Sequence, residues 1–195
     1  SLFAGIGAAH LPNSYGVIHL LREMGYTVRP VSTKKSDYSL ETKDRIDKLF
    51  VKHDFSKQTS FDGSFSTMLP GRLYEFPESG GVRMAVHPDM ANGARYVITR
   101  INTYASLYGK LKSNYMRKLD SLFFENIPGK ILSKSEIQID GFPGFDITNR
   151  TKKGDLQRYK IIVTPVEIII FKASGKKDFI KREEVNQFFE EISFY

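Results

Sequence analysis

The stretch that most constrains the fold is residues 2–31, which predicts a strand, a glycine turn, an amphipathic helix and a second strand. Residues 2–6 form an apolar run with little alternation, as in a strand buried on both faces. Apolar residues at helical spacing follow in residues 17–24, and Gly25 is placed to end the helix. Residues 26–31 then return as a strand. Parallel strands need neighbouring strands and cover on both faces. We therefore expect this β-α-β unit to be the last repeat of a larger α/β domain.

This stretch resembles the C-terminal end of the TraB/GumN family, whose superfamily includes the TIKI metalloproteases. The resemblance rests on Gly-Ala-Ala-His-Leu-Pro at 7–12, Tyr-Gly-Val-Ile-His-Leu-Leu at 15–21 and Met-Gly-Tyr-Thr-Val-Arg-Pro-Val at 24–31. The family carries two G-x-x-H motifs, and residues 7–10 match the second. Asn13 and Ser14 depart from the small residue or glycine that is usual there. The resemblance implies that residues 1–33 are the C-terminal β-α-β piece of such a domain.

His10 is the residue to which this resemblance assigns chemistry. Because the family is associated with metal-dependent peptide-bond hydrolysis, the resemblance implies that His10, in a G-x-x-H motif with Gly7, is a metal ligand. A catalytic metal site needs about three protein ligands and an open position, whereas this stretch offers one. We therefore expect the chain alone to be inactive and to hold no cofactor, and the full-length protein to bind a divalent metal. The alternative is that His10 only hydrogen-bonds the backbone in a turn.

The remainder of the chain predicts a different architecture. Residues 34–54 indicate a polar linker with a short helix, and residues 55–195 alternate short strands with turn signals such as Asp62-Gly63. Helices are predicted over residues 108–124 and 181–191, where apolar residues recur three and four apart. The order favours an α+β fold, an antiparallel sheet flanked by helices. The principal strands are predicted at 72–76, 82–86, 94–105, 130–139, 144–150, 157–163 and 166–173, with a turn at 141–144.

Residues 55–195 resemble the PsbP-like fold. The matching segments are Ser-Phe-Asp-Gly-Ser-Phe-Ser at 60–66, Gly-Phe-Pro-Gly-Phe-Asp at 141–146 and Phe-Phe-Glu-Glu-Ile-Ser-Phe at 188–194. That group includes photosystem accessory subunits, a nuclear-transport Ran-binding protein and bacterial domains of unknown role. Its members mostly bind or assist, so the resemblance implies an accessory domain that binds an unknown protein or small ligand.

Composition narrows the classes of function. The absence of cysteine excludes disulfides, thiol nucleophiles and thiolate metal sites. A net charge of +7 suits nucleic acid or anionic lipid, but the basic residues are scattered and lie near acidic residues or turns. Basic–aromatic neighbours such as Arg95-Tyr96 and Arg158-Tyr159 are explained as well by strand alternation, so nucleic acid is a disfavoured partner. No apolar run reaches the roughly 20 residues of a transmembrane helix.

Two hypotheses remain open: the C-terminal portion of a TraB/GumN-like metal-dependent hydrolase with an accessory PsbP-like domain, and a non-enzymatic binding protein. The family resemblance implies a bacterial, extracytoplasmic protein, periplasmic or membrane-associated. His53, Asp54 and His87 could be combined into a site on paper, but nothing in the sequence fixes their mutual geometry. Unpaired strands in residues 2–31 would also favour self-association, or packing of that stretch against the larger domain.

Overall fold

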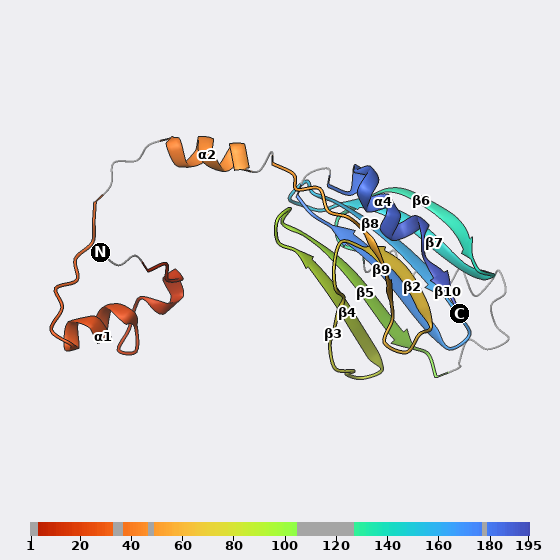
Figure 1. Cartoon of the computed structure of the whole chain (residues 1–195), viewed down its shortest axis with the longest axis horizontal. Helices are drawn as coiled ribbons and strands as arrows, with labels where there is room; N and C mark the ends of the chain where they lie inside the picture. Colours follow the sequence, from red (N-terminus) through yellow and green to blue (C-terminus); the bar gives the residue numbers. More distant parts are fainter. Residues whose placement is uncertain (1–3, 33–36, 47–48, 105–126, 177–178) are drawn as a thin grey trace. The chain divides into compact units, whose positions relative to one another are not determined.

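The computed structural model of the chain describes all residues except 1–3, 33–36, 47–48, 105–126 and 177–178 (Figure 1). The chain divides into two compact units, Ser1–Asp47 and Lys48–Tyr195. The helix predicted over residues 108–124 lies outside the described residues. Each unit is described by itself below.

The first unit is made of short helical elements and irregular backbone. Its elements are a 3-10 turn at Ala8–His10, helix α1 at Val17–Glu23 and helix α2 at Tyr38–Ile46. The predicted helix in residues 17–24 is confirmed, and Gly25 follows it with φ +88°, the left-handed conformation that favours glycine.

Neither of the two strands predicted on either side of α1 is formed within the described residues, since residues 4–7 and 26–32 belong to no sheet; residues 2–3 of the first predicted strand lie outside the described part of the chain. A parallel strand exists only with hydrogen-bonded neighbours, and the described residues of this unit supply none. No residue of α1 is buried, and Leu20, Met24 and Tyr26 expose large apolar side chains. The described residues of the first unit therefore include the helix of a β-α-β repeat but neither a strand nor a buried residue of that helix.

The second unit is organised around a seven-stranded sheet of order β3-β4-β5-β9-β8-β7-β6, in which every neighbouring pair is antiparallel. β3 and β6 are its edges. Apart from the step to β9, the strands follow one another in the sheet nearly as they do in the sequence. The bounds are β3 Tyr74–Glu75, β4 Val82–Asp89, β5 Ala94–Asn102, β6 Lys130–Ile139, β7 Phe142–Arg150, β8 Leu156–Val163 and β9 Glu167–Ser174.

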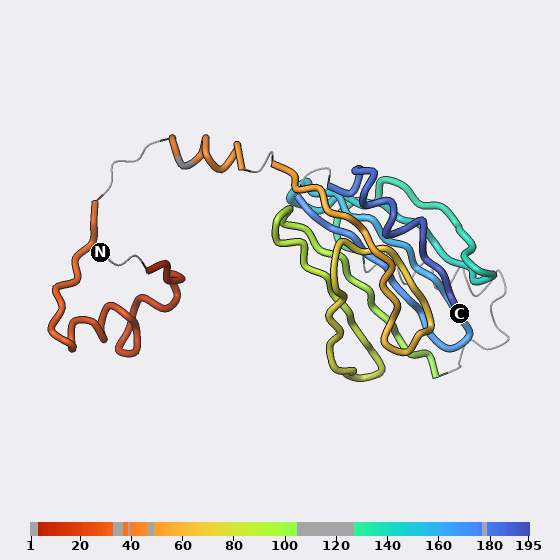
Figure 2. The backbone as a smooth tube through the Cα atoms, in the orientation of Figure 1, coloured from red at the N-terminus to blue at the C-terminus, as the bar shows by residue number. Residues whose placement is uncertain are grey.

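A three-stranded sheet and a helix pack on one face of the large sheet. The small sheet consists of β1 Ser56–Thr59, β2 Phe65–Leu69 and β10 Ser193–Phe194, and α4 Glu183–Glu190 follows a 3-10 turn at Phe179–Lys181. Figure 2 shows how the C-terminal end of the chain returns beside β2 to complete the small sheet. The core between these layers is aromatic: Phe65 and Phe188 each pack edge-on against Phe171 of β9.

The predicted α+β class with an antiparallel sheet is confirmed, and β6 has the predicted bounds. One turn is corrected. Residues 141–144 were expected to be a turn, but Asp140 and Gly141, with φ +48° and +85°, form a two-residue turn, and β7 begins at Phe142. Pro143 is tolerated in β7 because the pairing of β7 with β8 begins only at Gly144.

Candidate functional site

A cleft lies where the β1–β2 turn meets the β3, β4 and β5 end of the large sheet. About 350 Å³ of space lies within it, most of it open to solvent, and its enclosed part has a volume of about 30 Å³, so a ligand would lie largely at the open mouth. The described residues that line it are mostly apolar, with charged side chains among them. They are Ser60, Phe61, Asp62, Phe65, Glu75, Phe76, Arg83, Met84, Ala85, Ile98 and Arg100.

The β1–β2 turn forms one wall and is fixed by its own polar groups. Ser60 and Ser64 both donate hydroxyl hydrogen bonds to Asp62 Oδ1, at 2.9 and 2.7 Å. Gly63 adopts φ +71°, which a glycine accepts without strain. This turn holds Phe61 92 % exposed, while the Phe61 N–H donates to Glu75 Oε1 at 3.0 Å. The turn is thereby tied to the edge strand β3 while an aromatic ring remains in solvent.

The floor of the cleft is built by the pairing of β4 with β5. Ala85 lies opposite Ile98, and both are buried together with Phe65 of β2. Phe76 and Met84 are 52 % and 42 % exposed, so apolar surface continues from the floor to the mouth. A cleft of this kind favours an apolar ligand group, because its occupation removes further apolar surface from water.

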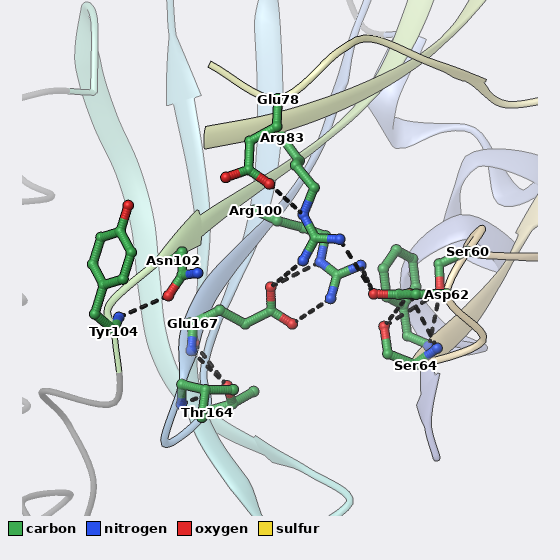
Figure 3. A network of polar contacts seen from close by, with 12 residues as sticks. Ser60, Asp62, Ser64, Glu78, Arg83, Arg100, Asn102, Tyr104, Thr164 and Glu167 are labelled. Carbon is green, nitrogen blue, oxygen red and sulfur yellow. Dashed lines mark hydrogen bonds and ion pairs between the residues drawn. The ribbon is translucent and has the colours of Figure 1, made fainter. Parts of the chain in front are cut away.

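Arginines on β4 and β5 form the charged part of the cleft (Figure 3). Arg100 donates to both carboxylate oxygens of Glu167, at 2.6 and 2.8 Å, and also to Asp62 Oδ2 at 2.7 Å. The backbone N–H of Glu167 donates to Thr164 Oγ1 at 3.0 Å. This bond fixes the backbone of Glu167 at the start of β9. Arg100 is thus held by two carboxylates from two different layers of the fold.

Arg83 lies opposite Arg100 in the sheet and is held less tightly. Its closest carboxylate oxygens are those of Asp62 at 3.4 Å, Glu78 at 3.7 Å and Glu167 at 3.9 Å. The side chain is 41 % exposed, compared with 12 % for that of Arg100. The pair therefore divides into a structural arginine and a more accessible one at the same cleft.

The protonation of Asp62 suits ion pairing rather than proton donation. Burial alone would raise its pKa, but hydrogen bonds from Ser64, Arg100 and Ser60 hold the pKa of this carboxyl well below its usual range. A general acid needs a pKa raised toward the working pH. None of the described residues lining the cleft is a histidine, lysine or cysteine, so this lining offers no nucleophile–base pair of the Ser–His or Cys–His type.

His10, the sequence-predicted metal ligand, lies at the end of the 3-10 turn that begins after Gly7. Its backbone N–H donates to the Gly7 carbonyl at 2.9 Å, while its ring is exposed and makes no hydrogen bond or ion pair with another described residue. In the described part of the chain no three His, Asp or Glu residues are grouped to hold a metal ion. His10 alone does not fit a metal site, so any further ligands must come from outside these residues.

Gly16, in the motif that follows His10, lies where the backbone leaves no room for a side chain. A Cβ at this position would lie 2.1 Å from the Pro12 carbonyl oxygen and 2.4 Å from that of Leu11. The loop after His10 therefore crosses directly over the first turn of α1. The role of His10 as a ligand stays a prediction, but the local shape that presents it depends on this glycine.

The other titratable residues singled out from the sequence, His53, Asp54 and His87, are not brought together. His53 Nε2 lies 3.4 Å from Asp89 Oδ1, and His87 Nδ1 lies 2.8 Å from the Arg72 carbonyl oxygen. Asp54 is exposed. Asn92 in the β4–β5 turn donates its backbone N–H to Asp89 Oδ1 and its side-chain amide to Asp89 Oδ2, so His53 contacts a carboxylate that anchors this turn.

The basic–aromatic neighbours follow strand alternation. Tyr96 and Tyr159 are 1 % and 6 % exposed, so neither ring is available to stack on a base. Arg95 is exposed, whereas Arg158 donates to both oxygens of Asp146. These rings belong to the core, as the alternation predicted.

Sequence reasoning identified Asp62-Gly63 as a turn but missed the cleft beside it. The cleft depends on which strands become neighbours, and the pairing that sets Arg83 opposite Arg100 spans the β4–β5 hairpin. A signal was present: Arg83 and Arg100 are charged residues on the same face as the apolar Ala85 and Ile98. Charge on an otherwise buried face of a sheet indicates an ion-pair network or a site.

Comparison with known proteins gives likeness of structure only. No family model and no curated protein matches the sequence, so the TraB/GumN resemblance of residues 1–33 stays a prediction. Among solved structures, the chain is similar to the cyanobacterial PsbP of Synechocystis sp. PCC 6803. The sequences are 12 % identical, the match covers 74 % of this chain and 95 % of that one, and the TM-score is 0.46.

A protein of unknown function from Pseudomonas aeruginosa is also similar, at 18 % identity over 69 % of this chain and 91 % of that one, with a TM-score of 0.36. At such identities and scores the likeness does not extend to function. Within the described residues, no helix is long and apolar enough to cross a lipid bilayer. The extracytoplasmic location stays a prediction.

Proposed function

We propose that residues 48–195 form a non-catalytic binding domain whose ligand site is the cleft between the β1–β2 turn and strands β3–β5. The observation that carries this proposal is the lining itself. Buried Phe65, Ala85 and Ile98 form an apolar floor that continues into partly exposed Phe76 and Met84. Concave apolar sites with a few convergent polar groups are the usual form of small-ligand sites.

The charged groups of the cleft support binding over catalysis. Arg100 is neutralised by Glu167 and Asp62, and Asp62 is stabilised in its ionised form. Such a network orients a ligand without supplying a proton acceptor, a nucleophile or an electrophile. The domain would therefore capture a ligand or partner and leave any chemistry to another part of the protein.

The proposal extends to the first unit as the C-terminal piece of a TraB/GumN-like hydrolase domain, to which the binding domain is joined. Two features support it. Helix α1 has no buried residue, as expected of a helix whose cover lies in another part of a domain. His10 has an exposed ring with no described partner, as expected of a ligand that needs further groups. The chain alone would then be inactive.

The binding site is tested by titrating the ¹⁵N-labelled chain with the neutral probe 4-phenylbutan-1-ol. We expect saturable amide shifts that concentrate on Phe61, Ala85 and Ile98. The variant Ala85→Phe fills the floor of the cleft and should abolish them. Ala91→Phe makes the same change at an exposed residue of the β4–β5 turn and should leave them intact.

Two results would contradict the binding-domain proposal. One is the absence of saturable shifts around the cleft at probe concentrations up to its solubility. The other is binding by Ala85→Phe with the affinity of the unchanged chain, which would place the probe elsewhere. The spectrum of each variant shows independently whether the fold is retained.

A further inference from the structure

The charge around the cleft is opposite to that of the chain. The sequence carries a net charge of +7. Around the cleft, however, two guanidinium groups, Arg83 and Arg100, face four carboxylates. Asp62 and Glu75 line the cleft, and Glu78 and Glu167 contact its arginines. An acidic site on a basic protein disfavours the anions that the rest of the surface attracts.

Glu75 is the carboxylate of the cleft that forms no ion pair with a described residue. Its Oε1 accepts one hydrogen bond, from the Phe61 N–H, and within the described residues no lysine or arginine pairs with it. By contrast, Glu167 takes two hydrogen bonds from Arg100 and Asp62 takes one. The cleft therefore contains a partly exposed carboxylate that has a backbone donor to hold it and no cation to neutralise it.

Two phenylalanine rings accompany this carboxylate. Phe61 and Phe76 line the same cleft and are 92 % and 52 % exposed. Exposed aromatic faces attract cations through their quadrupole, and a carboxylate beside them adds Coulomb attraction. Neither ring is covered by a basic side chain in the described part of the chain, whereas Phe65 deeper in the cleft lies 5.5 Å from the Arg100 guanidinium carbon.

We infer that the cleft binds a hydrophobic cation, an amine or guanidinium joined to an aromatic or branched aliphatic group. Its apolar part would rest on Phe65, Ala85 and Ile98, and its charge would lie at Glu75 beside Phe61 and Phe76. This inference rests on the proposed binding function and specifies its ligand class. Charge complementarity with Glu75 selects a cation over an anion, and the apolar floor selects it over a simple metal ion.

The test uses three probes that share one phenylbutyl group: 4-phenylbutylamine, 4-phenylbutan-1-ol and 4-phenylbutyrate. Dissociation constants are measured by NMR titration of the full chain at low ionic strength. We expect the amine to bind about fivefold to tenfold more tightly than the alcohol, and the carboxylate to bind most weakly. Raising the salt concentration should reduce the advantage of the amine, because the subsite is partly exposed.

The variant Glu75→Gln separates charge from shape. Its amide oxygen can still accept the Phe61 N–H, so the turn keeps its anchor. We expect it to weaken amine binding about fivefold, to the affinity of the alcohol, and to leave alcohol binding unchanged. Glu183→Gln removes the same charge from the exposed first residue of α4, away from the cleft lining, and should change neither.

The outcomes distinguish this inference from the proposal beneath it. Equal affinities of amine and alcohol, or an amine affinity that ignores Glu75→Gln, would overturn the ligand class and leave the cleft as a binding site. A preference for 4-phenylbutyrate would overturn it as well. Failure of all three probes to bind would overturn both.

Discussion

The two units of this chain place their apolar residues in opposite ways. In Lys48–Tyr195, a seven-stranded sheet is covered by a second sheet and by α4, and Phe188 is fully buried against Tyr96 and Phe171. In Ser1–Asp47, α1 carries an apolar stripe of which no residue is fully buried. The difference teaches that an amphipathic pattern specifies a face to be buried, while the fold must supply what buries it.

The largest expected effect is on the core of the second unit. Phe188→Ala removes a ring that is 0 % exposed and should lower the free energy of unfolding by about 3–5 kcal/mol. Leu20→Ala in α1 removes a partly exposed side chain and should change it by less than about 0.5 kcal/mol. Urea denaturation of both variants checks the contrast. A comparable loss from Leu20→Ala would mean that α1 is covered in this chain.

The ion-pair network ranks next. Arg100→Met leaves Glu167, 11 % exposed, without its bidentate partner and should lower the free energy of unfolding by about 3 kcal/mol. The double variant Arg100→Met/Glu167→Met should recover most of this loss, because the buried Glu167 carboxylate is then gone, while the more exposed Asp62 keeps Arg83 at 3.4 Å. Chemical denaturation of Arg100→Met, Glu167→Met and the double variant measures the coupling. Additive losses would show that the two side chains do not act as a pair.

Two glycines give a matched comparison between the units. A Cβ on Gly144 of β7 would lie 2.2 Å from the Ile161 carbonyl oxygen, and one on Gly16 would lie 2.1 Å from that of Pro12. Gly144→Ala should lower the free energy of unfolding by about 2 kcal/mol, because β7 must shift within the sheet. Gly16→Ala should leave the denaturation midpoint unchanged and alter only the amide shifts of residues 10–23. A fall in the midpoint with Gly16→Ala would contradict the division of the chain into two compact units.

The ionisation of Asp62 makes the stability of the fold depend on pH. Because its pKa is held below the usual range in the folded state, the stability that its charge confers is present above the unfolded pKa of about 4. That stability is lost as the pH falls toward the folded pKa. The difference in unfolding free energy between the unchanged chain and Asp62→Asn should be constant from pH 7 to about 5 and shrink below about 4. Asp54→Asn, at an exposed residue, should show no such change.

The smallest effect on stability is expected at His10. His10→Ala should leave the free energy of unfolding within about 0.5 kcal/mol, because the ring has no described partner. In the full-length protein the same change should remove bound divalent metal, measured by elemental analysis. His19→Ala, which removes an exposed contact with Glu23 at 3.2 Å, is the control and should retain it. Unchanged metal content in His10→Ala would refute the ligand role.

Local signals predicted much of the second unit. The strand predicted at 130–139 is confirmed as β6, and the helical spacing of apolar residues in 181–191 predicted the buried face of α4, Val185, Phe188 and Phe189. The same reasoning failed for residues 4–7 and 26–32, whose apolar pattern describes strands that find no neighbours. Strand formation depends on pairing, which a single segment does not encode.

The candidate site was less predictable than the fold. The residues that form it come from β1–β2, β3, β4, β5 and β9, and their meeting depends on sheet order and register. Asp62 was identified as a turn residue, but its bond to Arg100 links positions 38 apart in the sequence. Glu75 becomes distinctive only because no lysine or arginine in the described part of the chain pairs with it, which no local pattern reveals.

Amide hydrogen exchange on the full chain, read by mass spectrometry, tests most directly whether the two units differ as described. We predict that β5, β8 and β9 exchange with opening free energies near that of global unfolding, while residues 17–31 exchange almost as fast as an unfolded peptide. Protection of residues 17–31 to the level of β9 would contradict it, because α1 would then have a buried face within this chain.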